Sequence, residues 1–498
     1  MGMAQEEAPN LDPADWQELR ALGHRMLEDM FDSIEHVRDR PVWQTMPDCV
    51  RQQFRSGLPE ISTDLAAVYE EFSRTVVPYA LGNVHPGFMG WVHGGGTPVG
   101  MLADMLAAGL NANAGGRDHA AIEVERQIVE WVREIFEFPS SASGLFVTGT
   151  SMANLLAVLI ARTHALGVGC RKEGIASEGA GLRAYTSTAA HGCIAKAMDI
   201  SGLGTDALRM IETDRCHRID VAALRDAIRA DRDKGLAPFL VIASAGTVDA
   251  GAIDDLAAIA CICRDEGLWF HVDGAFGALA KLSADLAPRL AGIENANSIA
   301  FDFHKWGQVP YDAGFLLVRD ASQHLDAFAS PATYLRRETR GMAAGSPWPC
   351  DFGPDLSRGF RALKTWFTLK TFGVNRIGAV IAHTCELARY LEARVRAEPQ
   401  LELLAPAQLN IVCYRYRFRD PNRSNAALAV AIQESGVAAP STTILGGQLA
   451  IRAAIVNHRT QRQDIDALVD ITLKLAAGIE GSSVQKSNLR ETLDHQAA

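Results

Sequence analysis

The pattern of hydrophobic and polar positions changes twice along the chain. Residues 1–95 show helical patterns separated by joints rich in proline and glycine, such as "RPVWQTMP" and "NVHPGFMG". Further on, short β-rich runs alternate with helical patterns: "LRAYTS" precedes "CIAKAMDISG", "FLVIAS" precedes "IDDLAAIACICRDEG", and "LWFHV", "SIAFDF" and "GFLLV" follow. This alternation predicts an α/β fold with a mainly parallel central sheet and helices on both faces.

The last part of the chain has a different pattern. A long helical stretch begins near "LSRGFRALKTWFTLKTFG", and the strand-like runs "NIVCYRYRF" and "QLAIRAAIVN" precede a closing helix. We therefore expect an N-terminal helical segment over residues 1–95, a large domain over 96–362 and a smaller α+β domain over 363–480. Residues 481–498 are polar, which predicts a flexible tail.

Composition narrows the classes of protein that the chain can represent. At 48% hydrophobic and 21% charged residues, the 498-residue chain is typical of a soluble globular protein. A net charge of -11 argues against nucleic-acid binding, which needs a basic face. The acidic start lacks a signal-peptide pattern and no apolar stretch is long enough to span a membrane, so we expect a cytoplasmic protein. Nine scattered cysteines without metal-site spacing predict reduced thiols and no metal.

Polar side chains follow the β-rich runs at the points where the strands should end. His191, Thr247, Asp273 and the pair His304 and Lys305 occupy such positions. Ligands of open α/β sheets bind outside the carboxyl ends of the strands. Taken alone, Lys305 also suits a helix start or a snorkelling side chain, and Asp273 suits a helix N-cap. Their joint occurrence favours one shared site.

A pyridoxal 5'-phosphate cofactor would account for this set of residues. A lysine such as Lys305 can form a Schiff base with its aldehyde, and a carboxylate such as Asp273 can keep the pyridine nitrogen protonated. His191 can stack on the ring. We expect burial and the cationic ring to lower the pKa of Lys305. Thr150 and Ser151 open the apolar helix "TSMANLLAVLIAR" and suit the phosphate.

Five stretches of the sequence resemble the group II pyridoxal-phosphate amino-acid decarboxylases, which include the aromatic-amino-acid, histidine and glutamate decarboxylases. They are "GTSMAN", "STAAHGCIAKA", "HVDGAFGA", "FDFHKW" and "SRGFRALKTWFTLKTFG", and they occur in the family's order. The resemblance runs from about residue 15 to residue 480. It implies fold type I, the aspartate aminotransferase-like fold, and decarboxylation of an L-amino acid to its amine and CO2.

The resemblance also implies roles for individual residues. The proline- and glycine-rich stretch "SPATYLRRETRGMAAGSPWPCDFG" matches the family's mobile loop, in which Tyr334 would protonate Cα after CO2 leaves. Asp302 stands where several relatives carry asparagine, and Gly274 replaces the commoner alanine. The catalytic residues implied are Lys305, Tyr334, His191 and Asp273, and the cofactor would contact Lys305, Thr150, Ser151, His191, Thr247, Asp273, Ala275, Asp302 and His304.

The family forms homodimers with shared active sites, which implies the same assembly here. Phe88, Trp91 and His93 offer aromatic surface to a substrate, so an aromatic or similarly bulky amino acid is favoured. The stretch "LNANAGGRDHAA", with Asn113 and Arg117, would then contribute across the dimer interface.

Several alternatives stay open. The polar character of "LNANAGGRDHAA" also allows an acidic or polar substrate, with Arg117 pairing with its carboxylate, but Arg117 suits an interface ion pair with Asp118 equally well. Arg452 leaves open a fold-type-I aminotransferase or another lyase. A catalytically silent cofactor-binding protein is disfavoured by the intact Lys305, Asp273 and Tyr334. Which amino acid is the substrate, and whether an oxidative side reaction occurs, does not follow from the sequence.

Overall fold

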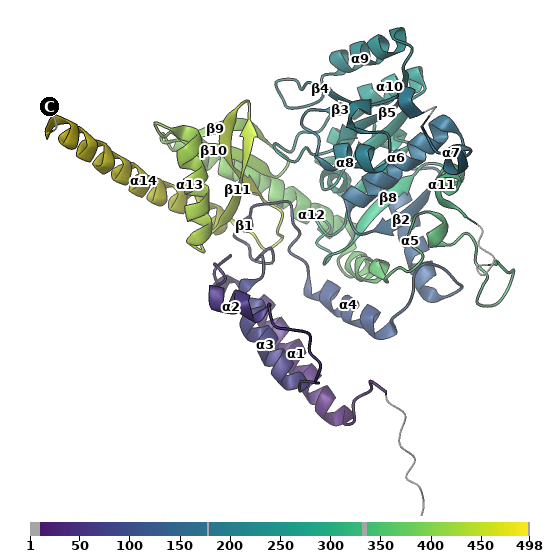
Figure 1. Cartoon of the computed structure of the whole chain (residues 1–498), viewed down its shortest axis with the longest axis horizontal. Coiled ribbons are helices and arrows are strands. Elements are labelled where there is room, and N and C mark those ends of the chain that lie inside the picture. The colour runs from purple at the N-terminus through teal and green to yellow at the C-terminus, as the bar shows by residue number, and fades with distance from the viewer. Residues whose placement is uncertain (1–9, 177–178, 331–335, 497–498) are drawn as a thin grey trace, which may run out of the picture.

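The computed structural model describes residues 10–176, 179–330 and 336–496, with side chains described as far as residue 480. Figure 1 shows a large α/β part, a smaller part around a second sheet, and N-terminal helices that project away from both. The helices before the large sheet are α1 (Trp16–Glu35), α2 (Asp48–Gln53), α3 (Leu65–Thr75), α4 (Pro98–Leu110) and α5 (Ala120–Ile135).

The large sheet has seven strands in the order β2-β8-β7-β6-β5-β3-β4. Neighbours among β7, β6, β5, β3 and β4 run parallel, whereas β8 is antiparallel to both β2 and β7. The expected mainly parallel sheet is therefore confirmed. The strands are β2 (Ser143–Val147), β3 (Leu182–Ser187), β4 (Leu208–Ile211), β5 (Ala237–Ser244), β6 (Trp269–Asp273), β7 (Ser298–Asp302) and β8 (Gly314–Val318).

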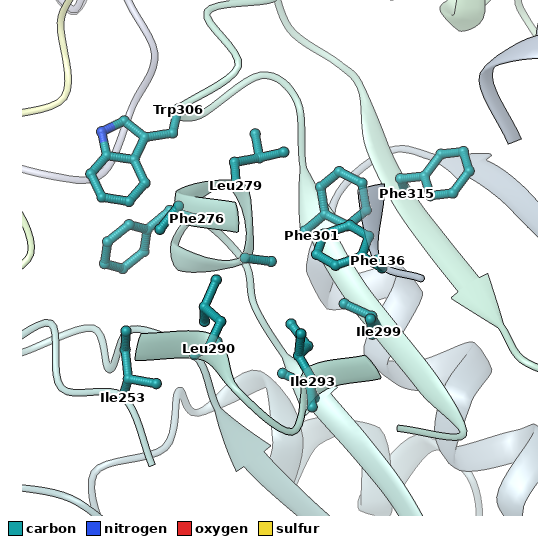
Figure 2. Packing of buried hydrophobic residues seen from close by; sticks show 14 of the residues in the cluster. Phe136, Ile253, Phe276, Leu279, Leu290, Ile293, Ile299, Phe301, Trp306 and Phe315 are labelled. Carbon is teal, nitrogen blue, oxygen red and sulfur yellow. The ribbon is translucent and has the colours of Figure 1, made fainter. Parts of the chain in front are cut away.

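The two faces of the large sheet pack into separate hydrophobic clusters. Along β5, Leu240 and Ile242 belong to one cluster, and Val241 and Ala243 belong to the other, because successive side chains of a strand point to opposite faces. Figure 2 shows part of the second cluster, in which the ring of Phe301 on β7 lies next to those of Phe136 and of Phe315 on β8. Helices α6 (Thr150–Leu166), α7 (Cys170–Glu173), α8 (Cys193–Ile200), α9 (Val221–Asp233), α10 (Leu256–Glu266) and α11 (Ala321–Phe328) complete this part.

The second sheet has five strands in the order β1-β11-β12-β10-β9. Its outer strand β1 (Phe88–Met89) comes from the N-terminal segment and pairs parallel with β11, whereas the other neighbours are antiparallel. The domain boundaries expected from the sequence remain predictions. The remaining elements are α12 (Arg361–Ala397), β9 (Leu401–Gln408), β10 (Ile411–Tyr416), α13 (Pro421–Glu434), β11 (Ala439–Leu445), β12 (Gln448–Ala454) and α14 (Arg462–Gln496).

Candidate active site

The order of the strands brings the predicted polar residues to one edge of the sheet. β3, β5, β6 and β7 are neighbours, and each has a candidate at or just beyond its carboxyl end. Asp273 is the last residue of β6 and is buried, with 6% of its surface exposed. Lys305 lies three residues beyond the end of β7. Parallel neighbours end at the same edge of a sheet, which is why these residues meet.

Lys305 forms an ion pair with the buried carboxylate of Asp302, the last residue of β7. Its Nζ lies 2.8 Å from Oδ2 of Asp302, and the other oxygen of Asp302 accepts the backbone N–H of Thr150 at 2.7 Å. Burial opposes the charged ammonium, but the carboxylates of Asp302 and Asp273 outweigh it and raise the pKa of Lys305. From the sequence we expected a lowered pKa for Lys305, but the groups of the protein itself raise it. That expectation did not include the negative charge of Asp302.

The segment around Lys305 is anchored by packing on both sides. The next residue, Trp306, is fully buried, donates its Nε1–H to Oγ1 of Thr384 at 3.0 Å, and meets the ring of Phe276 edge-on at 5.3 Å (Figure 2). On the other side, Gly94 donates its backbone N–H to the carbonyl of His304 at 3.2 Å. A Cβ on Gly94 would lie 2.5 Å from the carbonyl oxygens of His304 and Lys305, so only glycine allows this approach.

The carboxylate of Asp273 receives two hydrogen bonds inside the protein. The backbone N–H of Ala275 donates to Oδ1 at 3.1 Å, and the side-chain amide of Asn154 donates to Oδ2 at 3.0 Å. Burial raises the pKa of Asp273, whereas Lys305 and these two donors act in the opposite direction. A buried carboxylate in this environment is suited to a cationic partner such as a protonated pyridine ring.

The start of α6 fits the phosphate of the expected cofactor. Oγ1 of Thr150 is buried and has no hydrogen-bond partner among the described atoms, and the neighbouring Ser151 is exposed. Hydroxyl groups at a helix N-terminus are suited to an anion. The ring of His304 lies beside them: its Nδ1 accepts the N–H of Ala313 at 3.0 Å, and burial lowers its pKa to about 4. His304 therefore lies here as a neutral ring with Nε2 protonated.

Thr247 follows β5, the strand next to β6, and His191 follows β3, the next strand along the sheet. The ring of His191 is exposed at the start of α8, and its Nδ1 accepts the N–H of Cys193 at 3.2 Å. Thr247 is buried and accepts the N–H of Ala252 through Oγ1 at 2.9 Å, which closes the turn after β5. Both residues lie at the edge of the sheet that carries Asp273, and the contact of each with a ring stays a prediction.

The three aromatic candidates from the N-terminal segment form a cluster that reaches Lys305. The rings of Phe88, Trp91 and His93 lie within 5.8–6.1 Å of one another. Burial and the charge of Lys305 lower the pKa of His93, and the next residue, Gly94, donates its backbone N–H to the carbonyl of His304. Tyr311, which the sequence did not single out, extends the cluster, because its ring lies 5.8 Å from that of His93 and 4.2 Å from that of His304.

Asn113 and Arg117 lie in a different place. They line a cavity of about 660 Å³ together with Met342, Leu356 and other residues, none of which follows a strand of the large sheet. The guanidinium of Arg117 lies over the ring of Trp348 at 4.6 Å. Within one chain, the structure therefore does not bring these two residues together with Lys305, and a substrate contact would have to cross to a second copy.

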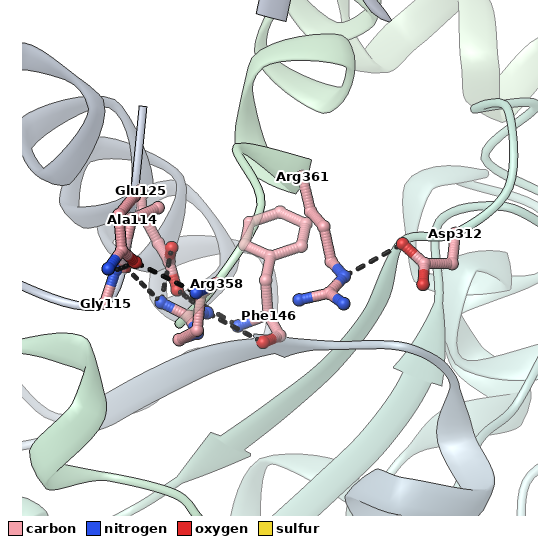
Figure 3. A network of polar contacts seen from close by, with 8 residues as sticks. Ala114, Gly115, Glu125, Phe146, Asp312, Arg358 and Arg361 are labelled. Carbon is pink, nitrogen blue, oxygen red and sulfur yellow. Dashed lines mark hydrogen bonds and ion pairs between the residues drawn. The ribbon is translucent and has the colours of Figure 1, made fainter. Parts of the chain in front are cut away.

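A buried ion pair that the sequence did not reveal holds this loop against the large sheet. Arg358 contacts both carboxylate oxygens of Glu125 at 2.7 and 3.1 Å, and donates to the carbonyls of Ala114 and Phe146 (Figure 3). Both side chains are less than 5% exposed. The motif "SRGFRALKTW" contains Arg358, but nothing in the sequence indicated its partner.

Three further expectations concern Tyr334, metal binding and membrane-spanning helices. Tyr334 lies outside the described residues. Within residues 10–176, 179–330 and 336–496, no group of three or more His, Cys, Asp or Glu side chains is arranged to hold a metal ion. In the same part of the chain, no helix is both long and apolar enough to cross a membrane.

The comparisons of the chain with a family model and with known proteins agree with one another. Residues 47–417 match the family model described as the pyridoxal-dependent decarboxylase conserved domain. An aromatic-L-amino-acid decarboxylase of Bacillus atrophaeus is 34% identical over 94% of this chain and 97% of its own length. A phenylacetaldehyde synthase of Arabidopsis thaliana is 27% identical over 91% of this chain and 95% of its own.

A solved structure is similar over almost the whole chain. The Oryza sativa protein TDC, crystallised with PLP and tryptamine, superposes with a TM-score of 0.85 at 24% identity, covering 94% of this chain and 100% of that one. This likeness shows the fold.

Proposed function

The chain belongs to the pyridoxal-dependent decarboxylase family, and we propose that it converts an aromatic L-amino acid to the corresponding amine and CO2 at the site around Lys305. The observation that carries this proposal is the position of Lys305 and the buried carboxylate of Asp273 at adjacent strand ends. These residues fit the cofactor, since they offer an amine for its aldehyde, an anion for its ring nitrogen and, in Thr150, an unpartnered hydroxyl for its phosphate.

The residues of the chain have separate tasks in this proposal. When bound, the cofactor supplies a protonated ring that accepts the electron pair of the bond broken at Cα. Asp273 would stabilise the cationic ring nitrogen, and His191 would cover the ring face. The aromatic cluster around His93 orients the substrate and excludes water from the bond to be broken. Tyr334 would donate a proton to Cα, and Nζ of Lys305 would supply the amine that holds the cofactor.

The first experiment tests the cofactor and the reaction class together. The purified chain with added pyridoxal 5'-phosphate should absorb near 400 nm, roughly where such imines absorb, and should release CO2 from its substrate. Lys305→Ala should lose the absorbance band and turnover. An oxo acid in place of CO2 would identify an aminotransferase instead. A Lys305→Ala protein with full activity would contradict the assignment of the lysine.

The substrate class rests on the aromatic surface next to Lys305 and on the 34% identical relative named for aromatic amino acids. Incubation with the twenty amino acids and L-DOPA should yield amines from aromatic ones. His93→Ala should raise KM for them, because it removes the ring between Phe88 and Tyr311. Release of an amine from aspartate or glutamate alone would favour the acidic alternative and a role for Arg117.

A homodimer with shared active sites is part of the same proposal. Large apolar side chains are exposed on the N-terminal helices and on α4, where a second copy would cover them. Sedimentation should show a dimer, and Leu110→Glu should weaken it, since this side chain is 66% exposed. The exposed residues are Trp16, Leu65, Val68, Phe72, Met105, Leu106 and Leu110.

A further inference from the structure

A continuous chain of side-chain hydrogen bonds ends on the carboxylate of Asp273. Asn154 on α6 donates to Oδ2 of Asp273 at 3.0 Å, and Nε2 of His271 lies 2.8 Å from Oδ1 of Asn154. Nδ1 of His271 lies 2.8 Å from Oγ of Ser298, which accepts Nε1–H of Trp269 at 2.9 Å. This series of hydrogen bonds therefore runs from β7 and β6 to α6.

These side chains are all buried in the described structure. Asn154, His271 and Ser298 have no exposed surface, and Trp269 is 3% exposed. None of them follows a strand end, and none has a role in the reaction described above. Burying a polar group without a hydrogen-bond partner costs free energy, but a single partner for each of these side chains would already avoid that cost. The contacts nevertheless form one connected series, and this series ends on Asp273, the carboxylate expected to pair with the ring nitrogen of the cofactor.

The two ends of the series fix the direction of every hydrogen bond. The carboxylate of Asp273 can only accept when ionised, so Asn154 turns its NH2 group to Asp273 and its oxygen to His271. Nε2 of His271 must then carry the proton. Burial lowers the pKa of His271 to about 3, so the ring is neutral and its Nδ1 accepts from Ser298.

The other end agrees with this direction. The indole of Trp269 can only donate, so Oγ of Ser298 accepts from it and is left to donate its own hydrogen to His271. Every donor therefore points toward Asp273. Hydrogen bonds aligned in one direction polarise one another in a low-dielectric interior, and their dipoles stabilise a negative charge at the accepting end.

We propose that Asn154, His271 and Ser298 form a directional hydrogen-bond relay that keeps Asp273 ionised and oriented, with His271 as a positioning residue that acts on the cofactor through Asn154 and Asp273. The proposal rests on the proposed function for the role of Asp273. It adds that the affinity for the cofactor and the protonation of its ring depend on a histidine that does not touch it.

A matched pair of variants and a control test the relay. His271→Leu removes the donor to Asn154 at similar volume, whereas His271→Gln can keep an N–H at the position of Nε2. The control is His324→Leu, because His324 is also fully buried and also contacts a serine, Ser143, at 2.9 Å, in a place unconnected to Asp273. Each full-length protein is freed of cofactor and titrated with pyridoxal 5'-phosphate, with dissociation constant and absorption maximum as readouts.

We expect His271→Leu to bind the cofactor roughly tenfold more weakly, as loss of one buried donor implies, and to shift its absorption maximum. His271→Gln should recover most of the affinity, and His324→Leu should leave both readouts unchanged. Equal losses in His271→Leu and His324→Leu, or unchanged binding in His271→Leu, would overturn the relay, since a structural role alone predicts them.

A second measurement determines the tautomer of His271 in the wild-type chain. With 15N-labelled histidine, two-bond 1H–15N spectra of the cofactor-free wild-type chain should show His271 as the neutral tautomer with the proton on Nε2, assigned by its absence in His271→Gln. A proton on Nδ1, or on both nitrogens, would overturn the relay. This result does not depend on cofactor binding, whereas a wild-type chain that takes up no pyridoxal 5'-phosphate would instead refute the proposed function.

Discussion

Asp302 binds Lys305 and Thr150 with its two carboxylate oxygens. Oδ2 lies 2.8 Å from Nζ of the lysine, and Oδ1 accepts the backbone N–H that opens α6 at 2.7 Å. One buried carboxylate thus couples the amine expected to hold the cofactor to the helix expected to hold its phosphate.

Asp302→Asn should lower the pKa of Lys305. The amide oxygen can still accept from Thr150, but the negative charge that raises the lysine's pKa is gone. The rate at which cofactor-free protein captures pyridoxal 5'-phosphate, followed against pH, should therefore reach half its maximum at lower pH. Asp226→Asn, on an exposed side chain, is the control. An unchanged half-point in Asp302→Asn would contradict the ion pair.

Gly94→Ala should weaken cofactor binding. The new Cβ would lie 2.5 Å from the carbonyl oxygens of His304 and Lys305, so the lysine segment must move. We expect a loss of stability of about 1–3 kcal/mol, typical of overpacking, together with a higher dissociation constant for the cofactor in a titration. Gly169→Ala is the control, since no atom lies within 4 Å of its added Cβ. If Gly94→Ala and Gly169→Ala show the same stability and the same cofactor affinity, the backbone at residue 94 is not tightly packed against the Lys305 segment.

Arg358→Met should destabilise the folded chain by about 3–5 kcal/mol, because it leaves Glu125 as an unpaired buried charge. Denaturant unfolding measures this loss. Adding Glu125→Leu should recover part of it, since the stranded charge is then removed as well.

An exposed ion pair provides the control for Arg358. Arg229 lies 3.5 Å from Asp226, and both side chains are more than 70% exposed. Arg229→Ala should change stability by less than about 0.5 kcal/mol. A loss in Arg358→Met no larger than this one would mean that Glu125 finds another partner.

The folded chain should lose stability as the pH falls from about 6.5 toward 4. Burial lowers the pKa of His271 and His324 to about 3 and that of His304 to about 4, whereas all three titrate near 6.5 when unfolded. In this range the unfolded state binds protons that the folded state does not, so the free energy of unfolding decreases with falling pH. Each histidine contributes up to about 1.4 kcal/mol per pH unit.

Denaturant unfolding at several pH values between about 7 and 4 measures this dependence. His324→Phe removes one of the three titrating groups and should flatten the slope relative to the wild-type chain. A slope that stays the same would show that His324 is protonated in the folded state.

Tyr334→Phe should lower amine formation roughly hundredfold, as loss of a general acid does. The family resemblance assigns Tyr334 the proton for Cα, and phenylalanine at this position is typical of the family's aldehyde synthases. Aldehyde formation with uptake of O2 should increase in aerobic assays and stop under nitrogen. An unchanged rate of amine release would assign the proton to another group.

The functional residues at the strand ends could be predicted from the sequence, whereas the buried side chains that hold them in place could not. Asp273 and Lys305 were recognisable because a polar residue directly after an apolar run is unusual, and because parallel strands share one edge. The ends of β3 and β8 were also predicted correctly, since apolar runs with clear limits define them. Five strands were not predicted: β1 and β4 are short, β9 and β11 contain proline and polar residues, and β2 runs directly into the apolar helix α6.

His271 and Asn154 show why the inner support of the site was missed. His271 stands inside the strand "LWFHV", where a histidine reads as an ordinary buried side chain. Asn154 was the better signal, because it interrupts the apolar pattern of α6. Which face of β6 lies under α6, and therefore whether the two side chains meet, depends on tertiary packing that no local pattern contains.

The pairing of β1 with β11 has a consequence for synthesis. Phe88 finds its neighbour Ala439 only about 350 residues later in the chain. At the usual rate of translation, roughly 5–20 residues per second, a ribosome needs roughly 20–70 s to make that stretch. The nascent N-terminal segment, with its exposed aromatic and aliphatic side chains, must wait that long before its edge of the second sheet can form.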